Sequence, residues 1–312
     1  MPARYPRTVL GTCCLPWDEA GHLDEPLFRR SIRNLVAAGL PDLYVFGTAG
    51  EGHSITESGY RRVVEVFIDE TARAGGAPPM VGVINLSLPT MLERIAFGAT
   101  LGVKTFQFCL PSWGQMTDGE VRKVFAEVCG SFPDLNFLHY NLLRTGRLVR
   151  PAEYRELAGA HPNLVATKYG AGDPETVIGL LREAPELRHF FTEFGFYLGA
   201  PVGECGLLAS IAASNPKRAW AYFSAGVSGD QHKLTELYRE LCGVMHAVRR
   251  AAGGMGLTDG AYDKLIAKLA EPEFPLRLLP PYQSSTDAGY RQYLEDLSKN
   301  FPSWLPDRGQ GG

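Results

Sequence analysis

Residues 164–173 read LVATKYGAGD, and this segment decides how the rest of the chain is interpreted. Its first four residues are apolar or small, as in a parallel strand that is covered on both faces. Lys168 follows directly, and two glycines then predict a turn. Burial of an ammonium without a partner is costly, so the sequence leaves two alternatives. Either the lysine has a lowered pKa and is the neutral amine of a Schiff-base enzyme, or it extends to solvent or pairs with a carboxylate such as Asp173.

The pattern of a short apolar segment followed by glycine or proline recurs along the first two-thirds of the chain. The other seven segments are residues 9–14, 43–46, 80–84, 105–110, 135–140, 189–192 and 206–209. Between them lie segments with the periodicity of amphipathic helices, such as 88–101 and 121–129. Eight strand–helix units predict an α/β fold, a (β/α)8 TIM barrel, because an open sheet of eight parallel strands would leave two edges exposed. An open doubly wound sheet is the alternative.

The pattern changes after residue 215. Helical patterns without intervening strands cover residues 218–227, 231–250, 262–270 and 288–297. Residues 272–281 are rich in proline and predict an extended crossing. We therefore predict a barrel over residues 1–215, followed by the last barrel helix and a helical C-terminal extension over residues 216–312.

Composition argues against several classes of function. The chain has 312 residues, of which 45% are hydrophobic and 21% are charged, and its formal net charge is -3. This charge gives no electrostatic basis for binding nucleic acid or an anionic membrane. The amino-terminal residues lack the apolar core of a signal peptide, and no apolar run is long enough to cross a bilayer. We expect a soluble, cytoplasmic protein.

Cysteine and histidine spacings give no indication of a disulfide or a metal site. The six cysteines are at positions 13, 14, 109, 129, 205 and 242, and none are spaced as CxxC. Buried free thiols are expected. The seven histidines form no HExxH or HxH motif, so no metal is expected.

Residues that follow the predicted strands are candidates for chemistry, because active sites of such barrels lie at the carboxyl ends of the strands. Residues 47–52, GTAGEG, follow the second strand. Their backbone N–H groups could hold a small anion such as a carboxylate, with the hydroxyl of Thr48 beside it. The alternative is a glycine-rich turn without a ligand.

The fourth and fifth strands end in further candidates. Tyr140 could carry protons to and from a substrate, or it could be a packed residue with a satisfied hydroxyl. Arg144 in the following loop could bind a carboxylate in a bidentate manner or remain a solvated surface charge. Trp113 could line a pocket or contact another subunit, and the sequence does not choose between these alternatives.

Three motifs, taken in order, resemble the dihydrodipicolinate synthase / N-acetylneuraminate lyase family. They are residues 47–51 (GTAGE), residues 140–146 (YNLLRTG) and Lys168, and similarity at residues 206–208 and 276–286 extends the resemblance over nearly the whole chain. The family consists of class I pyruvate-dependent aldolases on a (β/α)8 barrel with a helical C-terminal extension. The resemblance therefore implies a lyase with this fold, no metal or organic cofactor, and a homo-oligomer, either a tetramer or a dimer.

The resemblance also implies a role for each candidate residue. Lys168 would form an imine with pyruvate or another 2-oxo acid, whose C3 would then make or break a carbon–carbon bond with an aldehyde. Tyr140 would be the proton shuttle, and Thr48 would relay protons to it. The N–H groups of Thr48 and Ala49 would hold the carboxylate of the 2-oxo acid. The backbone at Leu208 would line the same pocket.

Several departures from the family pattern argue against dihydrodipicolinate synthase itself. Ala49 replaces a hydroxyl residue, and residues 169–171 and 192–195 differ from the family pattern. The segment before Arg144 lacks the usual proline and is one residue shorter, which weakens the assignment of Arg144 to the second substrate. Trp113 stands where the synthase has a proton-relay tyrosine, and an indole cannot shuttle protons. We expect a relative with the same Schiff-base core and a different, less polar second substrate.

Three alternatives stay open on sequence alone. They are a dehydratase or hydratase that acts on a sugar-derived 2-oxo acid through the same lysine, dihydrodipicolinate synthase itself, and a non-catalytic protein that binds 2-oxo acids. Lys168, Tyr140 and Thr48 together argue against the last, because binding alone needs neither a nucleophile nor a proton shuttle.

Overall fold

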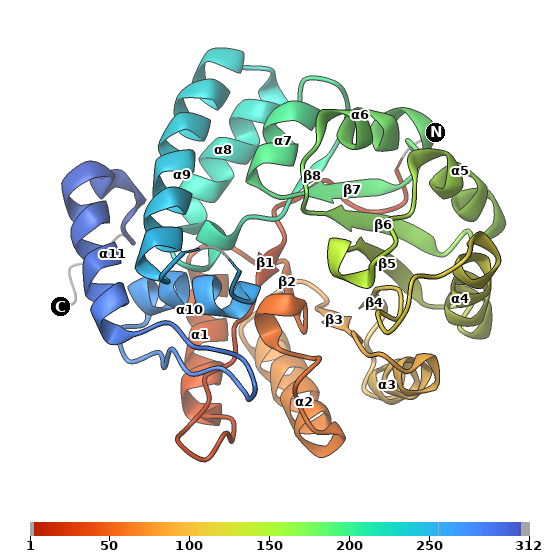
Figure 1. Cartoon of the computed structure of the whole chain (residues 1–312), viewed down its shortest axis with the longest axis horizontal. Coiled ribbons are helices and arrows are strands. Elements are labelled where there is room, and N and C mark those ends of the chain that lie inside the picture. Colours follow the sequence, from red (N-terminus) through yellow and green to blue (C-terminus); the bar gives the residue numbers. More distant parts are fainter. Residues whose placement is uncertain (1–2, 255, 307–312) are drawn as a thin grey trace.

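The computed structural model describes residues 3–254 and 256–306, in which eight parallel strands are surrounded by helices (Figure 1). The strands pair in the order of the chain. They are β1 (Gly11–Thr12), β2 (Leu43–Val45), β3 (Met80–Gly82), β4 (Thr105–Phe108), β5 (Asn136–Asn141), β6 (Leu164–Tyr169), β7 (Arg188–Phe191) and β8 (Gly206–Leu207). All eight predicted strands are present, although β1 to β4 and β8 are shorter than the apolar segments that predicted them.

Hydrogen bonds between the last and first strands close the ring. The N–H of Leu10 donates to the carbonyl of Leu207 at 2.9 Å, and the N–H of Leu207 donates to the carbonyl of Thr8 at 3.1 Å. A parallel bridge between Val9 and Leu207 accompanies these bonds. Closure removes the edges that an open sheet would expose, so the predicted (β/α)8 barrel is confirmed and the open-sheet alternative is wrong.

Helices follow the strands around the outside of the barrel. They are α1 (Glu25–Ala37), α2 (Glu57–Arg73), α3 (Leu88–Thr100), α4 (Asp118–Ser131), α5 (Pro151–Ala160), α6 (Pro174–Glu183), α7 (Glu193–Gly199) and α8 (Pro216–Ser228). Short 3-10 turns η1 (Thr48–Gly50), η2 (Leu143–Thr145) and η3 (Ser210–Ala213) follow β2, β5 and β8. The sequence did not predict α7, because seven residues are too few to show a helical period. No helix in the described residues is long and apolar enough to cross a membrane.

Alternation along the strands carries the two main candidate residues to the barrel interior. Leu138 on β5, Ala166 on β6 and Phe190 on β7 belong to the apolar cluster inside the barrel. Because side chains alternate with a period of two, Tyr140 and Lys168 share the inward phase of Leu138 and Ala166. Both therefore lie above the interior cluster, at the carboxyl ends of their strands.

The C-terminal extension packs on the end of the barrel that carries the candidate residues. It comprises α9 (Gln231–Ala251), α10 (Asp259–Ala270), α11 (Asp287–Asn300) and the 3-10 turn η4 (Pro302–Trp304). Residues 271–286 contain neither helix nor strand, as predicted for the proline-rich crossing. Figure 1 shows α10 and α11 in blue on one side of the barrel, and α10 contacts both η1 and η3. The division of the chain after residue 215 into two units stays a prediction.

Glu51 joins the barrel to the extension. Its carboxylate lies 2.6 Å from Nζ of Lys264 on α10, and it accepts hydrogen bonds from the indole of Trp17 at 2.8 Å and from the backbone N–H of Leu279 at 2.6 Å. The side chains of Glu51 and Lys264 are 2% and 0% exposed. Burial lowers the pKa of Lys264, and the Glu51 carboxylate offsets part of this effect. This buried ion pair fixes α10 against the loop that follows β2.

The cysteines are free thiols, as predicted. Five of the six are buried, but Cys242 is exposed on α9, so the expectation of burial is wrong for that residue. Within residues 3–254 and 256–306, no three histidine, cysteine, aspartate or glutamate side chains are grouped so that they could hold a metal ion.

Candidate active site

A cavity of about 630 Å³ lies at the carboxyl ends of the strands. Five of the seven residues predicted for the site line this cavity, although they come from segments far apart in the sequence. These residues are Ala49 on η1, Tyr140 on β5, Arg144 on η2, Lys168 on β6 and Leu208 after β8. The barrel thus brings together side chains that the sequence places up to 159 positions apart, the separation of Ala49 and Leu208 (208 minus 49).

The amine of Lys168 is buried and faces two phenol rings. The residue is only 5% exposed. Its Nζ donates to the hydroxyl of Tyr44 at 3.2 Å and lies 4.0 Å from the centre of the Tyr140 ring. Burial lowers the pKa of Lys168 to about 8, although three carboxylates around the cavity act in the opposite direction. Near neutral pH, a much larger fraction of this amine is uncharged than in an ordinary lysine.

Asp173 is not the partner of Lys168. Its carboxylate caps α6 by accepting the N–H of Thr176 at 2.8 Å, and it also accepts a hydrogen bond from the hydroxyl of Tyr169. Because the carboxylate is engaged at the start of α6 and the lysine is buried, both structural alternatives for Lys168, pairing with Asp173 and extension to solvent, are wrong.

Tyr140 and Lys168 are register partners on neighbouring strands, which explains why the amine lies over the phenol ring. Burial raises the pKa of Tyr140 above its ordinary value, and the nearby Thr48 hydroxyl offsets a part of this effect. That hydroxyl lies outside hydrogen-bonding geometry, so Oγ1 of Thr48 is buried with no partner in the described residues. An unpartnered buried hydroxyl next to a phenol is available to a ligand or a water molecule.

Backbone groups complete the cavity wall. Thr48 and Ala49 are the first residues of η1, so their N–H groups have no acceptor within that turn. Ala49 lines the cavity. Thr48, which precedes Ala49 in the chain, is not among the lining residues. The N–H of Leu208 donates to the carbonyl of Phe191 at 2.8 Å, so Leu208 contributes its other atoms to the wall.

Arg144 and Trp113 differ from the other candidates. The guanidinium of Arg144 donates to both carboxylate oxygens of Asp259 on α10, at 2.9 and 3.3 Å. Trp113 is 89% exposed and is not among the residues that line the cavity. The structure therefore brings Arg144 to the cavity already paired, and it does not bring Trp113 to the cavity.

Comparison with known proteins assigns the family. Residues 6–258 match the model of the Dihydrodipicolinate synthetase family. The chain belongs to this family. The membership that the three motifs predicted is thus confirmed over most of the chain.

The relatives of this protein share less than a third of their aligned residues with it. A 4-hydroxy-tetrahydrodipicolinate synthase of Thermus thermophilus is 29% identical over 233 residues, which cover 73% of this chain and 77% of that protein. A probable 5-dehydro-4-deoxyglucarate dehydratase of Oceanobacillus iheyensis is 23% identical over 271 residues, which cover 83% of each chain. YagE, a prophage protein from E. coli K12 whose structure contains pyruvate, has a TM-score of 0.83 at 17% identity and covers 94% of this chain and 97% of its own.

Several residues that line the cavity were not selected from the sequence, among them Tyr44, Glu193, Asp259 and Asp263. Tyr44 lies in a predicted strand, but only closure of the barrel brings its hydroxyl to Lys168. Glu193 accepts the N–H of Ser210 at 3.1 Å, and desolvation raises its pKa. Burial raises the pKa of Asp263 to about 7. Asp263 lies on the extension, where no local pattern marks it as part of a barrel site.

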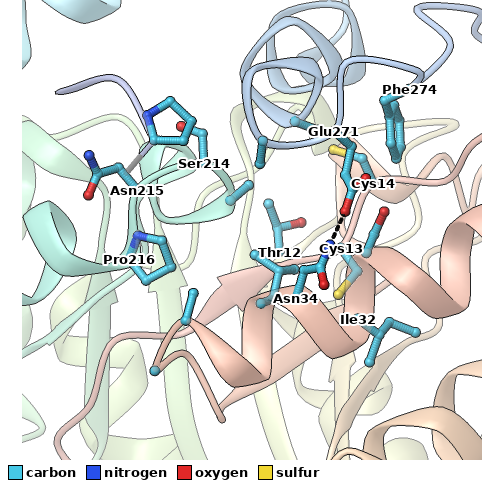
Figure 2. A pocket seen from close by; sticks show the side chains of 18 of the residues that line it. Thr12, Cys13, Cys14, Ile32, Asn34, Ser214, Asn215, Pro216, Glu271 and Phe274 are labelled. Carbon is cyan, nitrogen blue, oxygen red and sulfur yellow. Dashed lines mark hydrogen bonds between the residues drawn. The ribbon is translucent and has the colours of Figure 1, made fainter. Parts of the chain in front are cut away.

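A second cavity, of about 620 Å³, lies between α1, α8 and α10 (Figure 2). The thiols of Cys13 and Cys14 line it, and the side chain of Asn34 donates a hydrogen bond to Glu271 in its wall. Burial raises the pKa of Cys13 to about 12 and that of Cys14 well above its ordinary value. Both thiols are protonated at neutral pH and are poor nucleophiles. The cavity that contains Lys168 is therefore the candidate active site of this family member.

Proposed function

We propose that this protein is a Schiff-base-forming lyase of the aldolase type that acts on pyruvate or a related 2-oxo acid. The observation that carries the proposal is the buried amine of Lys168, which lies between the phenols of Tyr44 and Tyr140 in the cavity. A lysine with a pKa of about 8 is neutral often enough to attack a carbonyl carbon. One relative of the same fold contains pyruvate, which supports a small 2-oxo acid as the first substrate.

The proposed reaction begins at the C2 carbonyl of the 2-oxo acid. Nζ of Lys168 attacks C2, and loss of water gives a protonated imine. The imine withdraws electrons, so a proton leaves C3 and an enamine forms. C3 of the enamine then attacks the carbonyl carbon of an aldehyde and forms the new carbon–carbon bond. Hydrolysis of the imine releases the product, and the reverse sequence cleaves the same bond.

The neighbouring residues support these steps in the proposed mechanism. Tyr140 transfers protons during imine formation and bond making, because its phenol is buried next to the amine. The unpartnered hydroxyl of Thr48 relays protons to Tyr140. The N–H groups of Thr48 and Ala49, which have no acceptor within η1, bind the carboxylate of the 2-oxo acid.

A second candidate function is dehydration of a sugar-derived 2-oxo acid through the same lysine. Asp263 favours it, because a buried carboxyl with a pKa of about 7 can hold the proton that a departing hydroxyl needs. The relative from Oceanobacillus iheyensis carries the name of a dehydratase. Incubation with a 2-oxo sugar acid separates the two functions, since a dehydratase releases water and an aldolase releases an aldehyde.

We infer that the protein forms a homo-oligomer, as family members typically do. Three large apolar residues on the loops after β3, β4 and β5 are exposed to solvent. They are Leu86 (56% exposed), Trp113 (89%) and Leu143 (63%). These strands are neighbours in the barrel, so their loops share one face. A subunit contact on this face would border the cavity, because Leu143 also lines it. In such a contact, the exposed indole of Trp113 would pack against the partner subunit.

Reductive trapping tests the proposed function. Incubation with pyruvate and cyanoborohydride, followed by peptide mass spectrometry, should give a pyruvyl adduct on Lys168. The initial trapping rate should rise roughly tenfold between pH 6 and pH 7 and level off above about pH 8, because the neutral amine reacts and its pKa is about 8. A lysine with an ordinary pKa would instead show a rate that rises through pH 10.

The outcomes of trapping distinguish the candidate functions. An adduct with a longer 2-oxo acid but not with pyruvate would favour the dehydratase. No adduct with any 2-oxo acid would contradict Schiff-base catalysis and favour a non-catalytic binding protein.

Tyr140→Phe should slow trapping and carbon–carbon chemistry by about 10²–10⁴-fold, because phenylalanine keeps the ring and removes the proton carrier. The measurement is the rate of adduct formation with pyruvate, followed by the rate of product formation once an aldehyde is known. Tyr197→Phe is the matched control, since the Tyr197 hydroxyl bonds Thr235 and the residue does not line the cavity. Unchanged rates in Tyr140→Phe would remove this residue from its assigned role.

A further inference from the structure

An ion pair lies in the wall of the cavity where an acidic second substrate would need a cation. The guanidinium of Arg144 donates to both oxygens of the Asp259 carboxylate, at 2.9 and 3.3 Å. A guanidinium binds a substrate carboxylate in this same bidentate manner. Asp259 therefore occupies the groups of Arg144 that an acidic aldehyde would use.

Asp259 comes from the part of the chain that follows the family match. That match ends at residue 258, and α10 begins at Asp259. The buried pair of Lys264 and Glu51 fixes α10 against η1. The acid that pairs with Arg144 is thus held in place by the C-terminal extension.

Two more acidic residues line the same cavity. Glu193 accepts the backbone N–H of Ser210, and Asp263 is 6% exposed on the first turns of α10. Carboxylates accept hydrogen bonds from hydroxyl groups and repel a further carboxylate. Arg249 also lines the cavity, where its charge acts on Glu193. An acidic aldehyde would still meet three acids here, whereas the hydroxyl groups of an uncharged aldehyde would find acceptors.

We propose that Asp259 determines the acceptor specificity of this protein: by engaging Arg144, it makes the cavity select uncharged, hydroxyl-bearing aldehydes over aldehydes that carry a carboxylate. This inference rests on the proposed function, because it concerns the second substrate of the same Schiff-base reaction. Exclusion of acids follows from the Arg144–Asp259 pair, and preference for hydroxyl groups follows from Glu193 and Asp263.

The test compares two aldehydes and three proteins. The measured quantity is kcat/KM for addition of pyruvate to D-glyceraldehyde, which is uncharged, and to succinic semialdehyde, which carries a carboxylate. The wild-type protein should favour glyceraldehyde by about tenfold or more. Asp259→Asn removes the charge at constant size, so it should raise the ratio of succinic semialdehyde to glyceraldehyde activity by about tenfold or more. Adding Arg144→Gln to this variant should abolish the gain, because the guanidinium that Asp259→Asn releases is then absent.

Two results would overturn the inference: a wild-type preference for succinic semialdehyde, or an unchanged ratio in Asp259→Asn. Each protein is first tested for the pyruvyl adduct on Lys168, which also shows that it is folded, and Asp259→Ser replaces the asparagine variant if that variant gives no adduct. A wild-type protein that forms no adduct with pyruvate or any other 2-oxo acid refutes the proposed function. A wild-type protein that forms the adduct but prefers the acidic aldehyde refutes only the role of Asp259.

Discussion

Replacing Lys168 with alanine is expected to reduce the exchange of pyruvate methyl protons with solvent deuterium by about 10⁴-fold or more. Exchange requires the enamine, and the enamine requires the lysine amine. The measurement is proton NMR of pyruvate in D2O with catalytic amounts of protein. This assay needs no aldehyde, so it isolates the first half of the proposed reaction.

The fold should survive this substitution, because a buried ammonium opposes folding rather than supporting it. Lys168→Met keeps an unbranched side chain one atom shorter and without the amine. It should reduce the exchange rate as much as Lys168→Ala does, with a melting temperature at or above that of the wild type. Lys104→Ala, which removes an exposed lysine, is the control and should retain full exchange. Near-normal exchange in Lys168→Ala would exclude the Schiff-base mechanism.

Breaking the buried pair of Glu51 and Lys264 is expected to lower the free energy of unfolding by about 3–5 kcal/mol. Glu51→Gln leaves the ammonium of Lys264 without a counter-charge, and Lys264→Met leaves the carboxylate of Glu51 without one. Both side chains are 2% exposed or less, so water cannot replace the missing partner. Denaturant unfolding of each variant, monitored by circular dichroism, measures the decrease in the free energy of unfolding.

Two comparisons make this prediction specific to the buried pair. In the double variant Glu51→Gln/Lys264→Met, the free energy of unfolding should fall by less than the sum of the two single-variant losses, because no buried charge is then unpaired. Glu273→Ala removes an acid that pairs with Arg30 at the surface and should cost less than about 1 kcal/mol. A loss below about 1 kcal/mol in Lys264→Met would show that the pair does not hold the extension.

The fold could be predicted because its signals are local. Eight short apolar segments alternate with amphipathic helices, and each pattern can be recognised within one strand–helix unit. The exceptions have physical reasons. The helix α7 has seven residues, which is too short for a helical period to appear, and Cys242 faces solvent on α9 although cysteine is usually buried.

By itself, the sequence determined the barrel, the family and the position of Lys168 and Tyr140 at strand ends, because apolar segments, the turn residues after them and the three motifs are all local patterns. The tertiary structure alone decided which distant groups meet there. Arg144 pairs with Asp259, 115 residues away, and the hydroxyl of Tyr44 contacts an amine 124 residues away. The pKa of each group and the charge of the cavity depend on which residues are paired and which are buried. Pairing and burial depend in turn on how the barrel closes and how the extension packs, which no local sequence pattern encodes.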